Sequence, residues 1–247
     1  MFRLESIEIK WHTVGEACKM YALAYGMAFM ALTILNKSPE FNHIAQASPW
    51  IPKYLGDLLA FVVTMIMIWR ASQGSFGDYG FALAGRNLRL KLSIVLGTIF
   101  ALIWALLDYS LEAVTGNVET QAIYSRTVID VVGMLSFQWI FVGIFEEPLA
   151  RGLVQTRLMS ELRGILKILR WNFHVGTIVA GVLFGVGHIV PFIFFGQPWL
   201  FLGIEVIFAT LFGLLAGYIY QETRSLAGPI VMHNIVDGLL HTIALAC

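Results

Sequence analysis

Apolar residues dominate this chain in long runs that are separated by short polar segments. A helix that crosses a bilayer needs roughly 20 mostly apolar residues at a rise of about 1.5 Å per residue. The pattern therefore predicts transmembrane helices and an all-α fold, a polytopic bundle of about seven spans, or eight if one span escapes the pattern. The expected spans cover approximately residues 18–36, 51–70, 92–114, 127–147, 173–195, 198–220 and 226–246.

The composition agrees with a membrane protein. Hydrophobic residues make up 58% of the chain and charged residues 13%, with a mean hydropathy of +0.75. A soluble domain has about a quarter of its residues charged. The formal net charge is +0, so no basic surface favours a nucleic-acid partner. The two cysteines, Cys18 and Cys247, predict neither a disulfide framework nor a thiolate metal cluster.

The distribution of Lys and Arg predicts how the bundle is oriented. Of the 16 Lys and Arg residues, all but Lys37, Lys53 and Arg126 fall on one side of the expected topology. Because the cytoplasmic side carries the excess of positive charge, we expect a cytoplasmic N-terminus. The membrane itself is expected to be a bacterial inner membrane, which the charges do not decide. The linker from Gly152 to Trp171 interleaves basic and apolar residues, which predicts an amphipathic helix on the anionic leaflet.

The two halves of the chain differ in the motifs that they carry, and no obvious linker separates them. Residues 1–125 hold about three expected spans without a recognisable motif, whereas residues 126–247 carry ionisable groups inside apolar runs. Such groups are costly in a bilayer and mark functional sites by default. We therefore expect one compact membrane domain whose chemistry lies in its C-terminal half.

Two adjacent carboxylates, Glu146 and Glu147, close the fourth apolar run. Neighbouring helix residues point about 100° apart, so the two side chains cannot face one site equally. Glu147 and Arg151 have the i, i+4 spacing of an ion pair on one helix face, which leaves Glu146 as the freer carboxylate. The alternative is that both glutamates mark the end of a span at the headgroup level.

Histidines stand in two further apolar runs. His188 follows Phe184 by one turn, and a single histidine there is either a hydrogen-bonded packing residue or part of a site. His233 and Asp237 are four residues apart, so they share a helix face and could hydrogen-bond to each other. Two polar groups stacked on one face of a membrane helix are hard to explain by packing, which favours a functional role for this pair.

The three patterns occur in one order on three separate apolar runs: E-E-x-x-x-R at residues 146–151, F-x-x-x-H at 184–188 and H-x-x-x-D at 233–237. In this order they resemble the signature of the CAAX protease and bacteriocin-processing (CPBP, or Abi) family of intramembrane proteases. The resemblance covers roughly residues 126–246. Each motif is weak by itself, but the ordered set is a strong signal.

The resemblance implies an intramembrane endopeptidase that acts near the cytoplasmic membrane face. Glu146, as general base, and His188 would activate a water that attacks a peptide carbonyl, and His233 with Asp237 would stabilise the oxyanion. Glu147, Arg151 and Phe184 would support them. An ionised aspartate cannot donate a hydrogen bond to an oxyanion. Asp237 is therefore either protonated or paired with His233 so that the imidazole stays charged, and we favour the pairing.

The resemblance leaves the cofactor and the substrate open. Glu146, His188 and His233 could supply three ligands of a catalytic zinc with one open position. However, no H-E-x-x-H helix is present, and we favour a metal-independent protease of the glutamic type. The expected partners are membrane lipids and a peptide or protein substrate. Eukaryotic family members act on lipid-modified C-termini and bacterial members are linked to peptide processing and bacteriocin immunity, and the sequence does not select between them.

Two other functions and one geometric conflict accompany this interpretation. A proton-coupled transporter could use the same ionisable groups, but the inverted repeats that favour it are not found. A non-catalytic immunity or scaffold protein is the other alternative.

In the expected topology Glu146 and His233 lie near helix ends, whereas His188 lies about 20 Å deeper. The His188 helix must therefore begin deeper, or be short and tilted.

Overall fold

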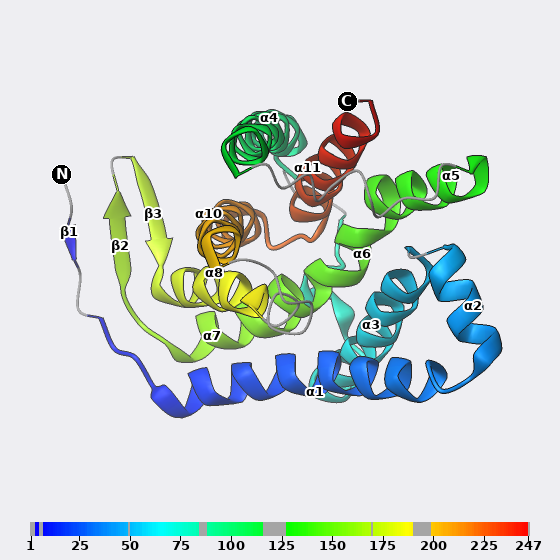
Figure 1. The fold of residues 1–247 in the computed structure, drawn as a ribbon. Coiled ribbons are helices and arrows are strands. Elements are labelled where there is room, and N and C mark those ends of the chain that lie inside the picture. Colours follow the sequence, from blue (N-terminus) through cyan, green and yellow to red (C-terminus); the bar gives the residue numbers. More distant parts are fainter. Residues whose placement is uncertain are drawn as a thin grey trace. The chain divides into compact units, whose positions relative to one another are not determined.

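The computed structural model describes residues 3–4, 7–48, 50–83, 88–115, 127–168, 170–189 and 199–246, and helices dominate them (Figure 1). The longer helices are α1 (Trp11–Leu35), α2 (Pro39–Ala47), α3 (Trp50–Ser72), α4 (Leu90–Thr115), α8 (Val175–Gly187), α10 (Trp199–Thr223) and α11 (Ala227–Ala246). A short 3-10 helix, η1, covers Phe76–Tyr79.

Six helices within these residues are long and apolar enough to cross a membrane. They are Trp11–Leu35, Trp50–Ser72, Leu90–Leu111, Val128–Glu161, Leu202–Thr223 and Ala227–Ala246, and Val175–Gly187 is a shorter apolar helix. This confirms the predicted fold class, a polytopic all-α membrane protein, with six long helices and one short helix for the seven expected spans. The end of the expected fifth span, residues 190–195, lies outside the described residues.

The fourth span is longer than the sequence predicted. We expected it to end at Glu147, but one helical run continues from Val128 to Glu161. It consists of α5 (Val128–Ser136), η2 (Phe137–Phe141), α6 (Val142–Glu147), η3 (Pro148–Gln155) and α7 (Thr156–Glu161), and η2 and η3 are π-helical.

The π-helical turn at Pro148 explains the difference. A proline inside an α-helix lacks a donor and its ring clashes with the carbonyl one turn earlier, so helices usually end or kink there. The wider i→i+5 turn of η3 begins at Pro148 and lets the helix continue past it. Glu146 and Glu147 therefore lie inside the helix rather than at its end.

The prediction of an amphipathic helix between Gly152 and Trp171 is wrong beyond Glu161. Strands β2 (Ile165–Ile168) and β3 (Trp171–His174) pair antiparallel, and β1 (Arg3–Leu4) pairs antiparallel with β2. The positive φ of Gly164, +118°, turns the chain before β2, and a glycine adopts this conformation without steric strain. Residues 165–168 then alternate between exposed and half-buried, the period-2 pattern of a strand.

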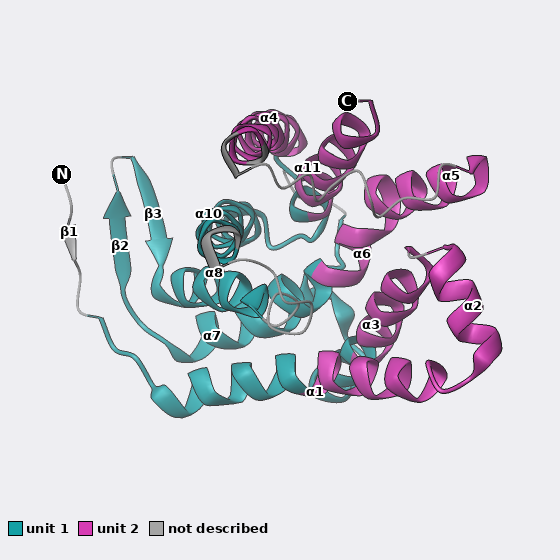
Figure 2. Cartoon of the chain, viewed as in Figure 1, with its two compact units in different colours: residues 1–22, 64–89, 147–229 teal, residues 23–63, 90–146, 230–247 magenta. Residues whose placement is uncertain are grey.

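The chain forms two compact units that interleave along the sequence (Figure 2). Unit 1 contains residues 1–22, 64–89 and 147–229, and unit 2 contains residues 23–63, 90–146 and 230–247. In unit 1, α8 and α10 meet where a Cβ on Gly213 would lie 2.9 Å from the carbonyl oxygen of Gly181, so small residues allow the close approach.

Aromatic rings pack α3 against the fourth span in unit 2. The ring of Tyr54 makes edge contacts with those of Phe137, Phe141 and Phe145, at centroid distances of 5.6, 5.6 and 5.5 Å. Phe137 and Phe145 are buried and form a core cluster with Val142. Edge-to-face packing of this kind is directional, so the cluster fixes where the first turns of α3 lie against α6.

Candidate active site

Glu146 projects from α6 into a group of charged side chains of unit 2. Its Oε2 lies 3.9 Å from Nε2 of His233 on α11, and its Oε1 lies 4.0 Å from Nζ of Lys53 on α3. The side chain is 14% exposed. These contacts are at ion-pair distance and are longer than hydrogen bonds. Glu146 is thus a mostly buried carboxylate that two basic groups flank without a tight bond.

His233 lies between two carboxylates. Its Nε2 is 3.7 Å from Oδ2 of Asp237, one turn further along α11, and 3.9 Å from Glu146. The imidazole is almost fully buried, with 6% of its side-chain surface exposed. The structure thus brings together three of the four residues predicted as catalytic, Glu146, His233 and Asp237, around one imidazole nitrogen.

An asparagine that the sequence analysis missed joins α6 to α11. Asn234 accepts a hydrogen bond from the backbone N–H of Gly143 at 2.8 Å and donates one to the carbonyl oxygen of Ile140 at 3.0 Å. The neighbouring π-helical turn η2 interrupts the regular α-helical bonding there. A Cβ on Gly143 would lie 2.7 Å from Oδ1 of Asn234, so only glycine fits. The sequence feature that could have indicated this role is the position of Asn234, a polar amide directly after His233 in an apolar run.

Lys53 and Asp57 also lie near Glu146 and were not predicted from the sequence as part of the site. Lys53 donates a hydrogen bond to Asp57 at 3.1 Å, one turn along α3, and its Nζ lies 5.0 Å from the centroid of the Phe137 ring. The sequence analysis placed Lys53 on the membrane side opposite the expected end of the Glu146 helix. That separation is wrong, because Glu146 lies inside a longer helix and its carboxylate approaches the ammonium to 4.0 Å.

The other motif residues form a packed column in unit 1. Nε of Arg151 donates to Oε2 of Glu147 at 2.9 Å, and both side chains are 0% exposed, so the ion pair expected from their spacing is present. The guanidinium carbon of Arg151 lies 5.0 Å from the centroid of the Phe184 ring. The ring centroids of Phe184 and His188 are in turn 4.8 Å apart. A buried carboxylate, a guanidinium and two rings are therefore stacked in sequence.

His188 stands at the end of a short helix. It is the C-cap of α8, which has 13 residues, so the helix is short, and its depth and tilt in the membrane stay predictions. Its Nδ1 lies 2.8 Å from the carbonyl oxygen of Phe184. A carbonyl oxygen only accepts, so Nδ1 carries a proton and donates it in this contact. His188 belongs to unit 1 and Glu146 to unit 2, and their direct pairing stays a prediction.

The charges around Glu146 do not fit a metal centre well. Among the residues that the structure describes, no group of three or more His, Cys, Asp or Glu side chains could hold a metal ion. A dication bound by Glu146 would also lie close to the Lys53 ammonium, 4.0 Å from the same carboxylate, and like charges repel at such distances. We therefore derive no catalytic step through a metal.

Comparison with known proteins identifies the C-terminal half. Residues 128–239 match the family model described as Rce1-like, type II CAAX prenyl endopeptidase Rce1-like. The match begins at α5 and ends within α11, so it contains all three motifs but not α3 with Lys53 and Asp57. It confirms the resemblance inferred from those motifs. Searches of curated proteins and of solved structures found no match.

Proposed function

We propose that this chain is an intramembrane endopeptidase of the Rce1-like family of CAAX proteases, whose model residues 128–239 match, and that Glu146 is its general base. The observation that carries this proposal is the carboxylate of Glu146, mostly buried and 3.9 Å from Nε2 of His233, inside a membrane-spanning helix. A carboxylate in such a place is expensive and needs a functional reason.

The proposed reaction uses a water as the nucleophile. Glu146, with His188, takes a proton from the water while the water oxygen attacks the peptide carbonyl carbon. The same proton passes to the amine nitrogen as the C–N bond breaks. General base and acid catalysis of this kind contributes about 10²- to 10⁴-fold. No covalent enzyme intermediate is required.

His233 would stabilise the oxyanion of the tetrahedral intermediate. Two carboxylates, those of Glu146 and Asp237, face its Nε2. Because carboxylates accept hydrogen bonds, this arrangement favours a proton on Nε2, the atom that would donate to the oxyanion. Asp237 would act through His233, as its counter-charge, and would not contact the substrate.

The family defines the substrate as a peptide or protein. We propose that the scissile bond lies near the cytoplasmic membrane face, with the N-terminus of the chain in the cytoplasm and the protein in a bacterial inner membrane. The family description names prenyl endopeptidases, so prenylated C-terminal peptides are one candidate class. Unmodified peptides are the other. We propose a metal-independent reaction, because Lys53 already supplies a positive charge beside Glu146.

Cleavage of a peptide library by purified protein tests this proposal. The library contains prenylated and unmodified peptides, and the protein is tested in detergent and in lipid bilayers. Glu146→Gln should lower the cleavage rate at least about 10²-fold. Glu40→Gln, which removes an exposed carboxylate of α2 in the same unit, is the matched control and should leave the rate unchanged.

Three outcomes would contradict the proposal in different ways. Equal rates for wild type and Glu146→Gln would remove Glu146 as the base. Loss of activity after exhaustive chelation, restored by zinc alone, would overturn the metal-independent mechanism. No cleavage of any peptide by the wild type would favour the scaffold or transporter alternatives.

A further inference from the structure

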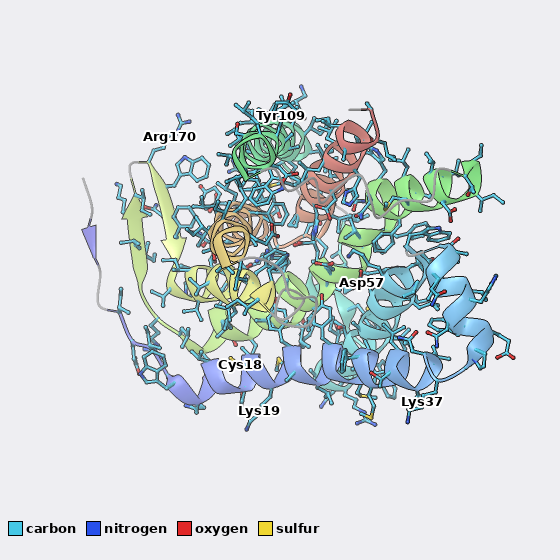
Figure 3. The ribbon with its side chains drawn as sticks, viewed as in Figure 1. Cys18, Lys19, Lys37, Asp57, Tyr109 and Arg170 are labelled. Atoms are coloured by element: carbon cyan, nitrogen blue, oxygen red, sulfur yellow. The ribbon has the colours of Figure 1, made fainter. Side chains whose placement is uncertain are left out.

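We propose that Lys53 is a positioning residue of this reaction: its ammonium holds the carboxylate of Glu146 in the orientation that faces His233, and Asp57 holds the ammonium. The inference rests on the proposed role of Glu146 as the base. It assigns a function to α3, which lies outside the residues that match the family. Asp57 is labelled on this helix in Figure 3.

The two oxygens of the Glu146 carboxylate have different partners. Oε1 faces Nζ of Lys53 at 4.0 Å, and Oε2 faces Nε2 of His233 at 3.9 Å. The terminal torsion of a glutamate is broad and roughly two-fold, so the side chain alone does not fix the carboxylate plane. Basic groups near both oxygens favour one rotation of this plane electrostatically. Lys53 therefore selects the rotation in which the second oxygen points to His233.

The lysine itself is held in place. A lysine side chain is long and flexible, and without partners it would sample many rotamers. Here Nζ is bonded to Asp57 at 3.1 Å and lies over the face of Phe137 at 5.0 Å, a cation–π arrangement. Asp57 is largely buried, with 12% of its side chain exposed. The contacts of Tyr54 with Phe137 and Phe145 fix α3 against the helix that carries Glu146.

The exposure of Lys53 argues for positioning rather than for core packing. Its side chain is 49% exposed, so it buries little surface in the interior of unit 2. Its charge matters locally, because the carboxylates of Asp57 and Asp237 both act electrostatically on Glu146 in unit 2. Without the ammonium, repulsion from Asp57 would turn the Glu146 carboxylate away from its present orientation.

The test measures kcat and KM separately for Lys53→Met, Lys53→Arg and Asp57→Asn. Misplacement of a catalytic group by about 1 Å can lower a rate about 10²-fold, so Lys53→Met should lower kcat by about 10- to 100-fold with little change in KM. Lys53→Arg keeps the charge and should recover most of the rate. Asp57→Asn should show a smaller loss of kcat. Lys37→Met, at an exposed lysine of the same unit, is the matched control and should behave as wild type.

A double mutant separates this inference from the proposed function. If Lys53 acts through Glu146, Lys53→Met should not lower the residual rate of the Glu146→Gln protein any further. A wild-type kcat in Lys53→Met, together with an inactive Glu146→Gln, would overturn the positioning role alone. A raised KM at constant kcat would assign Lys53 to substrate binding and overturn it too. Equal losses in the Met and Arg variants with a lowered Tm would show a structural role, and an active Glu146→Gln would overturn both proposals.

Discussion

Glu146 and Glu147 are neighbours on one helix, yet their surroundings differ in almost every respect. Glu147 belongs to unit 1, is 0% exposed and accepts a hydrogen bond from Arg151 at 2.9 Å. Glu146 belongs to unit 2, is 14% exposed and has basic groups at 3.9 and 4.0 Å. A carboxylate in a tight, buried hydrogen bond is unsuited to exchange protons with water, whereas a carboxylate that is oriented by charges at ion-pair distance, without a tight hydrogen bond, is suited to it. The comparison indicates that Glu147 stabilises the fold, whereas Glu146 is suited to take part in the reaction.

Removing either partner of the tight pair should have the largest effect on stability. Glu147→Met leaves the buried Arg151 charge without its counter-charge, which costs about 3–5 kcal/mol. For a chain of this size we expect Tm to fall by roughly 10 °C, measured by thermal unfolding in detergent. Arg151→Met should act similarly.

The double variant and the neighbouring glutamate sharpen this prediction. Glu147→Met with Arg151→Met removes both charges together and should recover much of the lost stability, since well-packed apolar side chains often replace a buried pair at little cost. Glu146→Met should leave Tm unchanged or raise it, because it removes one of several carboxylates that repel one another. A Tm for Glu146→Met as low as that for Glu147→Met would break the comparison. Strictly additive losses in the double variant would show that the pair is not coupled.

The looser group in unit 2 should tolerate a change that the tight pair does not. If Asp237 acts only through His233, by accepting from its Nε2, Asp237→Asn should keep activity within about tenfold of wild type, since an amide oxygen can still accept. Asp237→Ala, which cannot, should lose more. The ratio of kcat values for the three proteins measures this, and complete loss in the Asn variant would assign Asp237 a direct catalytic part.

Local patterns predicted what depends on local spacing. The apolar runs predicted the membrane helices, and the four-residue spacing predicted the ion pair of Glu147 and Arg151. The continuation of the helix past Pro148 was not predictable from these patterns, because proline usually ends a helix and a π-helical turn has no clear sequence signature. The strands after Gly164 were missed because interleaved basic and apolar residues also occur in amphipathic helices, and this segment was interpreted as one.

The parts of the site that were missed depend on tertiary contacts. Lys53 was interpreted as a residue at the membrane boundary, and nothing in its own segment indicates that its ammonium approaches Glu146. The approach depends on the packing of Tyr54 against aromatic side chains more than 80 residues later in the chain. Asn234 depends likewise on the close approach of α11 to Gly143. Pair distances of this kind follow from packing and not from periodicity.

The smallest expected effect concerns His174, a polar residue of unit 1 outside the membrane-spanning helices. Nδ1 of His174 accepts a hydrogen bond from the backbone N–H of Gly176 at 3.0 Å and caps α8. Burial, and in second place the positive charge of Arg224, lower the pKa of His174 below its usual 6.5. The folded protein therefore favours the neutral imidazole. As the pH falls through about 6.5, the unfolded chain gains a proton that the folded one does not, so stability decreases.

His174→Asn should remove this pH dependence. Asparagine also accepts from the helix N-terminus but does not titrate, so the cap is retained at every pH. Between pH 8 and pH 5.5, Tm of the wild type should fall further than Tm of the variant. A whole cap contributes about 1 kcal/mol, or about 2–4 °C for a chain of this length, which sets the upper limit of the difference. Parallel curves would show that His174 gains its proton as easily in the folded protein as in the unfolded chain.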